Sequence, residues 1–340
     1  MKRSGSELKG LSQNPGPERF LASQKDRENY LFLLNARDQI RGWLKAKKYL
    51  EVLIPALSTE TVPDLNLETF SVAFKSVFDA GKKRELFLQT SPELLIKRLL
   101  ASGFSALFYL GPVFRQGELA EKHHPEFTMV EWYRTGCTYL DLMSELEDML
   151  SGLFAVKKPI EKITMRDALL KAAGIDFIAL NDRKKLGGAI KTRDRFFKAR
   201  AMDWPELFEY AVVKWLDPWL QSKDAIFVYD WPEPLAMQAR LKSEGDWLVA
   251  ERFELYLRGI EIANGYTELT DAAEMEKRFS AEIKKRKKLK RKITPLPKNF
   301  LASLKLGMPD SAGVSLGLER LCLALLGLNN LDQLIAFREI

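Results

Sequence analysis

The segment Arg258–Glu268 concentrates side chains that could bind a cation. It places carboxylates at Glu261 and Glu268, with Asn264 between them, in a run that otherwise predicts a β-strand, and Glu254 lies shortly before it. Burying acids this dense is costly unless a cation lies among them. A divalent metal carrying nucleotide phosphates would suit, and so would an ammonium-bearing substrate. An edge strand with solvated acids explains this segment equally well, so the rest of the chain must decide.

Two further segments carry side chains suited to binding anions. Phe114-Arg115 is followed by His-His-Pro-Glu-Phe-Thr-Met at 123–129, and Gly-Val-Ser-Leu-Gly-Leu-Glu-Arg occupies 313–320. The planar guanidinium of arginine presents a fork of donors that matches phosphate and carboxylate. Taken singly, an arginine at a strand end is more often a surface ion-pair partner. These two segments indicate a function only in combination with the acidic segment 258–268.

The elements that must position these residues predict a sheet with helices around it. Strands are expected at 50–57 (interrupted by Pro55), 67–74, 86–88, 107–114, 127–133, 225–229, 252–257 and 313–318, and helices at 30–48, 91–101, 139–153, from 271 onwards and at 319–326. Ser91 is expected to cap the second helix, with Pro92 in its first position and Glu93 in its first turn. Loops and hairpins join neighbouring strands, so we expect an α+β fold with a mainly antiparallel sheet flanked by helices.

Composition indicates a soluble protein of one large domain. Of the 340 residues, 46% are hydrophobic and 29% charged, and no apolar run is long enough to span a membrane. We expect a cytoplasmic protein with a polar N-terminal tail over 1–26 and one folded domain over 27–340, in which 155–222 is a helical insertion of unknown role. Cys137 and Cys322 are expected to be unrelated buried thiols.

The positive charge is concentrated in one run. The net charge is +7, and residues 284–292 contain eight cations and no acid, so the rest of the chain has 45 basic and 46 acidic residues. A solvated helix face is the common explanation for such a run. The alternative is a docking surface for an acidic partner, either nucleic acid or protein.

In order and spacing, the motifs resemble the three-motif core of class II aminoacyl-tRNA synthetases, specifically the lysyl branch, from about residue 27 to the C-terminus. The combination of motifs is too specific to arise by chance. It consists of Phe114-Arg115 and the segments 123–129, 261–269 and 317–320. The resemblance implies ATP as cofactor and attack of an amino-acid carboxylate on its α-phosphorus. No protein nucleophile is needed, so catalysis is positioning and charge stabilisation.

The resemblance also implies roles for the residues that meet ATP. Arg115 would hold the α-phosphate and the substrate carboxylate, while His123 and Arg320 would reach the outer phosphates. Phe127, otherwise a core aromatic, would stack on adenine with Arg320 on its opposite face. Mg²⁺, which takes carboxylate and phosphate oxygens together, would be held by Glu254 and Glu261.

A diamino acid is the substrate that the resemblance implies. Glu131 and Glu268 would hold a side-chain ammonium with Tyr133 beside it. Glu93 would hold the backbone-side amine, and Asn264 would contact the carboxylate. Acids around a short aliphatic slot select a diamino acid over neutral ones, because an unpaired buried carboxylate is costly.

Two positions depart from the synthetase pattern. Gly117 stands where a glutamate would read the adenine edge, so either the loop shifts to let Glu118 serve or recognition relies on Phe127 and backbone groups. Ser315 stands where a lysyl enzyme would carry glycine, which reshapes the floor beside the amine. The substrate need not be ordinary α-lysine.

The chain also has too few residues before its first catalytic helix to form the anticodon-binding barrel of lysyl-tRNA synthetases. This combination closely resembles the elongation factor P β-lysine ligases, synthetase paralogues that activate (R)-β-lysine and transfer it to a lysine of elongation factor P. The resemblance implies a homodimer formed partly through the region 43–55. It also offers the basic run an acidic, tRNA-shaped protein partner, and makes tRNA itself an unlikely one.

Two other functions stay open at this point. A truncated synthetase would lysylate tRNA or another small acceptor. A non-catalytic synthetase-like protein would bind nucleotide or amino acid and regulate a partner; Gly117 favours it, whereas the retained Arg115, His123, Glu254, Glu261 and Arg320 argue against it.

Overall fold

The computed structural model describes residues 23–78, 83–198, 202–245 and 247–338. Its strands are β1 (Leu50–Glu51), β2 (Leu57–Ser58), β3 (Ser71–Lys75), β4 (Lys83–Leu88), β5 (Ala106–Phe114), β6 (Glu126–Thr135), β7 (Glu161–Thr164), β8 (Ala225–Pro232), β9 (Leu241–Glu244), β10 (Trp247–Leu257), β11 (Ile260–Thr267) and β12 (Ser311–Gly317). Its α-helices are α1 (Gln24–Ala46), α2 (Glu93–Ala101), α3 (Tyr139–Phe154), α4 (Met165–Ala173), α5 (Arg183–Arg193), α6 (Trp204–Ala211), α7 (Asp217–Leu220), α8 (Ala272–Lys288), α9 (Lys298–Lys305) and α10 (Leu318–Leu326).

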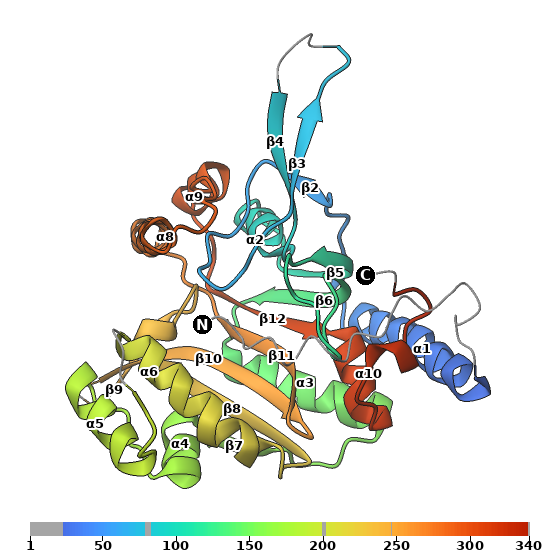
Figure 1. The fold of residues 1–340 in the computed structure, drawn as a ribbon. Helices are drawn as coiled ribbons and strands as arrows, with labels where there is room; N and C mark the ends of the chain where they lie inside the picture. Colours follow the sequence, from blue (N-terminus) through green and yellow to red (C-terminus); the bar gives the residue numbers. More distant parts are fainter. Residues whose placement is uncertain (1–22, 79–82, 199–201, 246, 339–340) are drawn as a thin grey trace.

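A large mixed sheet forms the centre of the molecule (Figure 1). Its strands follow the order β1-β5-β6-β12-β11-β10-β8-β7, and β9 pairs with β10. The two outermost pairs, β1 with β5 and β7 with β8, are parallel, and every other pair is antiparallel. The expected α+β fold with a mainly antiparallel sheet is therefore confirmed. No helix of the described residues is long and apolar enough to cross a membrane.

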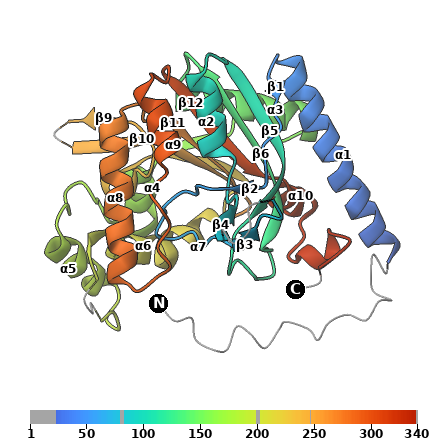
Figure 2. The ribbon, with the colours of Figure 1, turned by 90° about the horizontal axis from the view of Figure 1, so that it is seen from above.

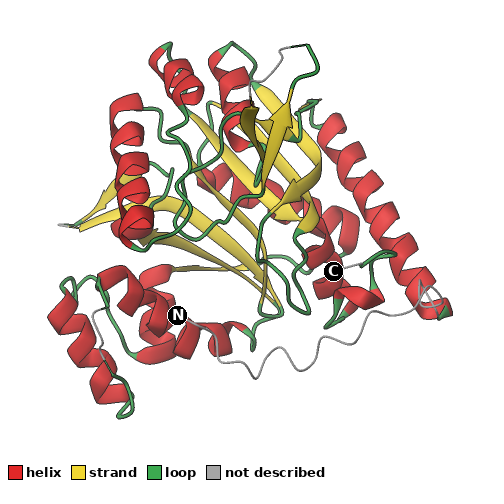
Figure 3. Ribbon diagram, turned by 45° about the horizontal axis from the view of Figure 1, so that its top comes forward, coloured by secondary structure: helices red, strands yellow, loops and turns green. Residues whose placement is uncertain are grey.

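Helices cover the two faces of this sheet unequally. The core on one face joins α1, α3 and α10 to residues such as Trp132 and Val314, and Figure 2 shows α1 along that side. The other face is covered at one end by α2, α8 and α9 and at the opposite end by α4 to α7. Figure 3 shows the strands running between these two helical groups. The middle of this face is where a site can form.

Several expected elements differ in detail. The strand expected at 50–57 is wrong: only β1 and β2 form, on either side of Pro55, which has no N–H to donate to a ladder. Within 155–222 the structure adds β7, which pairs in parallel with β8. The second helix begins one residue later than expected. Pro92 is its cap residue, and the Ser91 hydroxyl accepts from the Glu93 N–H at 3.0 Å.

The structure describes only the last residues of the expected tail. Residues 1–22 of the expected tail lie outside the described residues, and α1 begins at Gln24 with a capping box formed by Ser23 and Asp26. Cys137 and Cys322 are free and buried, as expected.

The basic run is not a uniform solvated face. Arg286 is 1% exposed and donates to the carbonyl oxygens of Asp64 (2.6 Å) and Leu67 (3.0 Å) and to the Glu68 carboxylate (2.7 Å). Lys292 pairs with Glu85 at 2.7 Å. These cations fasten the end of α8 to the segment that leads into the β3–β4 hairpin, which stands away from the body (Figure 1). Lys284, Lys287, Lys288 and Lys290 stay exposed.

Replacing Arg286 by methionine is therefore expected to destabilise the fold. The change removes the donor that several carbonyl groups share with the half-exposed Glu68 carboxylate, so the free energy of unfolding should fall by about 2–4 kcal/mol. Urea denaturation measures it, with Lys287→Met, an exposed neighbour, as the matched control. Equal stability of the two variants would contradict the anchoring role of Arg286.

Candidate functional site

One row of residues crosses the open face of the sheet. The strand register sets Glu254 of β10 opposite Asn264 of β11, Asn264 opposite Ser315 of β12, and Ser315 opposite Glu131 of β6. Directly paired residues project from the same face, so these side chains are neighbours. Above the row lies a cavity of about 1460 Å³ between the two helical groups.

A β-bulge brings Glu261 to this face. Leu255 pairs with Ala263, but the next residue, Tyr256, pairs with Glu261 instead of Ile262. The extra residue on β11 changes which side chains face the cavity. Glu261 lines the cavity together with Glu254, and burial, reinforced by the charge of Glu261, raises the pKa of Glu254 to about 7.

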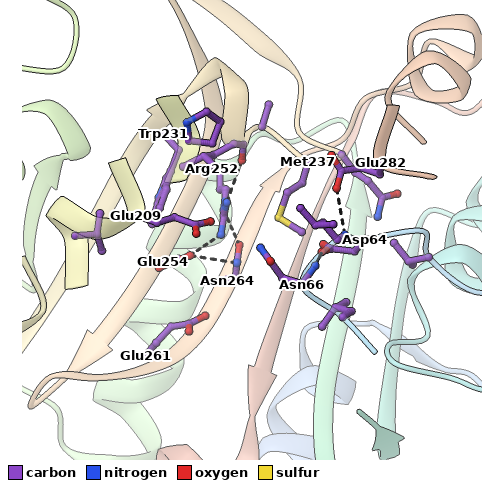
Figure 4. Close-up of a pocket in the computed structure, with 18 of the residues that line it drawn as sticks. Asp64, Asn66, Glu209, Trp231, Met237, Arg252, Glu254, Glu261, Asn264 and Glu282 are labelled. Atoms are coloured by element: carbon purple, nitrogen blue, oxygen red, sulfur yellow. Dashed lines mark hydrogen bonds and ion pairs between the residues drawn. The ribbon is translucent and has the colours of Figure 1, made fainter. Parts of the chain in front are cut away.

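Arg252 organises the acid end of the row, a role that the sequence analysis missed. Its guanidinium donates to Glu254 Oε1 at 2.5 Å and to Asn264 Oδ1 at 3.3 Å, and lies 4.4 Å from the Trp231 ring centroid (Figure 4). Tyr256 Oη donates to the other oxygen of Glu254 at 2.5 Å. The available signal was strand periodicity, because Arg252, Glu254 and Tyr256 alternate on one face.

Arg115 and Phe127 meet where β5 and β6 join the loop between them. The Arg115 guanidinium carbon lies 5.1 Å from the centre of the Phe127 ring, and Nη1 lies 3.6 Å from Glu118 Oε1. Gly117 has φ +86°, a backbone conformation that favours glycine over glutamate. Arg115, Glu118 and Phe127 all line the cavity.

Arg320 and His123 form a second cationic group on the cavity wall. Arg320 Nη2 donates to His123 Nε2, and Nη1 lies 3.4 Å from Glu261 Oε2. The neighbouring Glu319 accepts from the Thr128 N–H with both oxygens at 3.0 Å. This contact ties the start of α10 to β6 and so fixes Arg320 relative to the row.

A buried acidic cluster adjoins the cavity next to Ser315. Glu131 is 2% exposed and accepts from Ser91 Oγ at 2.8 Å and from Tyr133 Oη at 2.5 Å. Burial, with the charge of Glu93 adding to it, raises the pKa of Glu131 to about 7. A Cβ on Gly313 would lie 2.1 Å from the Tyr133 ring, so glycine is required for this packing.

Lys97, also missed by the sequence analysis, lies within this cluster. Its ammonium is 2.5 Å from Glu93 Oε1 and 2.5 Å from Glu268 Oε2. Beyond that ion pair, no described residue donates a hydrogen bond to either oxygen of Glu268. Burial raises the pKa of Glu268 to about 8 against the opposing charge of Lys97. The spacing of Glu93 and Lys97, one helical turn apart, was the available signal.

The structure thus divides the expected site residues into two adjoining groups. Arg115, Glu118, His123, Phe127, Glu254, Glu261, Asn264, Ser315 and Arg320 line the cavity. Glu93, Glu131, Tyr133 and Glu268 lie buried beside it. The segment 155–222 supplies part of the cavity wall through α6 residues such as Phe208 and Glu209.

Comparisons with known proteins identify the family of the chain. Residues 18–340 match the family described as class II tRNA synthetases (D, K and N), and the chain belongs to that family. Among curated relatives, the elongation factor P–(R)-beta-lysine ligase of Avibacterium paragallinarum is 37% identical over 300 residues, 88% of this chain and 91% of the relative. The same-named proteins of Histophilus somni strain 2336 (38% over 299 residues, 88% and 91%) and Haemophilus influenzae strain Rd (35% over 312 residues, 92% and 95%) are similar. Within the class II family, the chain belongs to this ligase group.

Proposed function

We propose that this ATP-dependent ligase activates (R)-β-lysine as an adenylate and transfers it to a lysine of elongation factor P. The observation that carries the proposal is a buried acidic cluster directly beside a cavity lined by Arg115, His123 and Arg320. Such a pair of environments suits a substrate with ammonium groups at one side and phosphates at the other. The names and coverage of the curated relatives point to the same acceptor and amino acid.

The chemistry needs positioning more than protein nucleophiles. A carboxylate oxygen of the amino acid attacks the α-phosphorus of ATP, and the bond to pyrophosphate breaks. The acceptor amine then attacks the carbonyl carbon of the adenylate, losing a proton, and AMP leaves. Arg115 would hold the α-phosphate and carboxylate, His123 and Arg320 the outer phosphates, with Phe127 and Glu118 at the adenine.

The amino-acid site rests on Glu131 and Glu268. Both carboxyl groups have raised pKa values caused by burial, as expected where a cation is missing from an acidic cluster. A substrate ammonium would provide that cation and the donors that Glu268 lacks. Glu93 already accepts hydrogen bonds from Lys97, Gln238 and Tyr266. The backbone-side amine of the substrate would therefore share Glu93 with these donors. Asn264 would contact the substrate carboxylate.

Magnesium would be held by Glu254 and Glu261. Two carboxylates on one wall of the cavity form a hard oxygen donor set that fits this ion when phosphate oxygens complete it. No group of three or more ligating side chains occurs among the described residues. Bound there, Mg²⁺ would neutralise phosphate charge.

The proposal includes a homodimer that acts in the cytoplasm. Leu50 and Leu53, within the expected interface region 43–55, are 52% and 99% exposed, and Leu31 of the preceding helix is 62% exposed. Apolar side chains this open are typical of surfaces that a second copy covers. Sedimentation equilibrium gives the mass of the assembly.

Transfer to the acceptor tests the proposal and the role of the basic run together. With ATP and (R)-β-lysine, the mass of elongation factor P should increase by one β-lysyl group, whereas tRNA should stay uncharged. Replacing Lys284, Lys287 and Lys290, which do not line the cavity, by serine should slow transfer about tenfold or more at low salt through weaker steering. Adenylate formation should be unchanged. Unchanged transfer would make these lysines a solvated face, and charging of tRNA would favour the truncated-synthetase alternative.

A further inference from the structure

Lys97 has an environment unlike that of the other lysines that the structure describes. Its side chain is 0% exposed, and both of its ion-pair partners belong to the acidic cluster. Besides Glu93 and Glu268, its ammonium meets Gln238 Oε1 at 3.3 Å and lies 5.2 Å from the Tyr266 ring centroid. Burial would lower the pKa of Lys97, but the charges of Glu268 and Glu93 outweigh it and the pKa is raised. The ammonium therefore stays charged.

The charges of the cluster can be compared with those of a diamino acid. The cluster contains three buried carboxylates, Glu93, Glu131 and Glu268, and one ammonium, that of Lys97, which pairs with Glu93 and Glu268. When all are ionised, two negative charges remain. A diamino acid brings two ammonium groups, and its carboxylate is directed to the arginine side of the cavity.

We propose that Lys97 is a specificity-determining residue that fixes Glu93 and Glu268 in place and leaves the pocket with the two negative charges that a diamino acid neutralises. The inference rests on the proposed function, since it concerns the same pocket. An amino acid with one amine leaves one buried charge unpaired, which disfavours its binding. Without Lys97 even a diamino acid cannot neutralise the cluster.

Lys97 is held too firmly to act as a displaceable occupant of the substrate site. Glu93 lies one turn away on the same helix, while Glu268 and Gln238 come from other parts of the chain. Gln238 Nε2 also donates to Glu93 Oε2 at 2.6 Å and lines the cavity. Lys97 and Gln238 therefore position the acids, and the remaining capacity of Glu268 and Glu131 is left for substrate.

Three variants set the pocket charge at different values, and a fourth serves as the control. Lys97→Met leaves three negative charges, Lys97→Met with Glu93→Gln restores two, and Glu93→Gln alone leaves one; Arg98→Met removes a neighbouring cation outside the cluster. The KM for (R)-β-lysine in ATP–pyrophosphate exchange is measured from pH 6 to 9. We expect Lys97→Met to raise this KM about tenfold at pH 7.5 and to move the midpoint of its pH dependence upward by about one unit, because the acids of the cluster lose the neighbouring positive charge that favours their ionised forms.

The other variants keep the inference falsifiable. The double variant should return the midpoint close to that of the wild type, and Arg98→Met should not move it. Glu93→Gln should lower the preference for (R)-β-lysine over 3-aminohexanoate, which lacks the terminal amine. If Lys97→Met does not fold, the double variant and Glu93→Gln still test the charge relation.

Two failures can be told apart. If Lys97 is only structural, Tm, kcat and the KM for ATP change together, the midpoint does not follow the pocket charge, and the inference is overturned. If the wild-type enzyme shows no exchange with any diamino acid, the proposed function fails instead.

Discussion

Arg320→Ala should reduce adenylate formation at least about 10³-fold, because it removes a fixed cation from the place where phosphate charge develops. Arg320 is held between His123 and Glu261, and Glu319 fixes its helix to β6. The rate of amino-acid-dependent ATP–pyrophosphate exchange measures the loss.

The control for this variant is Arg166→Ala. Arg166 of α4 forms a partly exposed, bidentate ion pair with Asp176 in the 155–222 segment, and neither residue lines the cavity. Its exchange rate should equal that of the wild type. Retained exchange in Arg320→Ala would remove Arg320 from the catalytic group and revive the regulator hypothesis.

Glu131→Gln should raise the KM for the diamino acid about 10²-fold or more while the KM for ATP stays nearly constant. The amide keeps the shape of the side chain and can still accept from Tyr133 Oη, which donates to the carboxylate at 2.5 Å. What is lost is a buried negative charge opposite an ammonium, an interaction that is strong where water is excluded. An equal rise in both KM values would indicate general damage and contradict the assigned role.

The pH dependence of stability gives Glu131 a second signature. Its pKa in the folded protein, about 7, lies above the ordinary value of 4.5 because the group is buried. The folded state therefore binds the proton more tightly, and this contribution to stability is present below pH 4.5 and lost as the pH rises through 7. The loss amounts to about 3 kcal/mol. In Glu131→Gln this part of the decline should disappear, as thermal unfolding at pH 5 and 8 can show.

The sequence predicts best those site residues that lie in or beside strands with a regular alternation of side chains. Glu254, Glu261, Arg115 and Arg320 all line the cavity, because their motifs lie in or beside strands with clear periodicity. The mainly antiparallel sheet followed from the same pattern. The family resemblance supplied roles that spacing alone left open.

What the sequence concealed depends on contacts between distant segments. Lys97 reads as one more cation on an amphipathic helix, yet it pairs with Glu268, far along the chain. Arg286 belongs to a run that suggests a solvated surface, yet it is buried against residues 64–68. The bulge that places Glu261 is set by strand pairing, and a single strand does not reveal its register.

The most direct test of the central claim is ATP–pyrophosphate exchange with (R)-β-lysine, with α-lysine and without amino acid. The account predicts rapid exchange with (R)-β-lysine, much slower exchange with α-lysine and none without an amino acid. Preference for α-lysine would contradict the proposed substrate and favour a truncated synthetase acting on another acceptor. Exchange with neither would contradict the enzyme account itself.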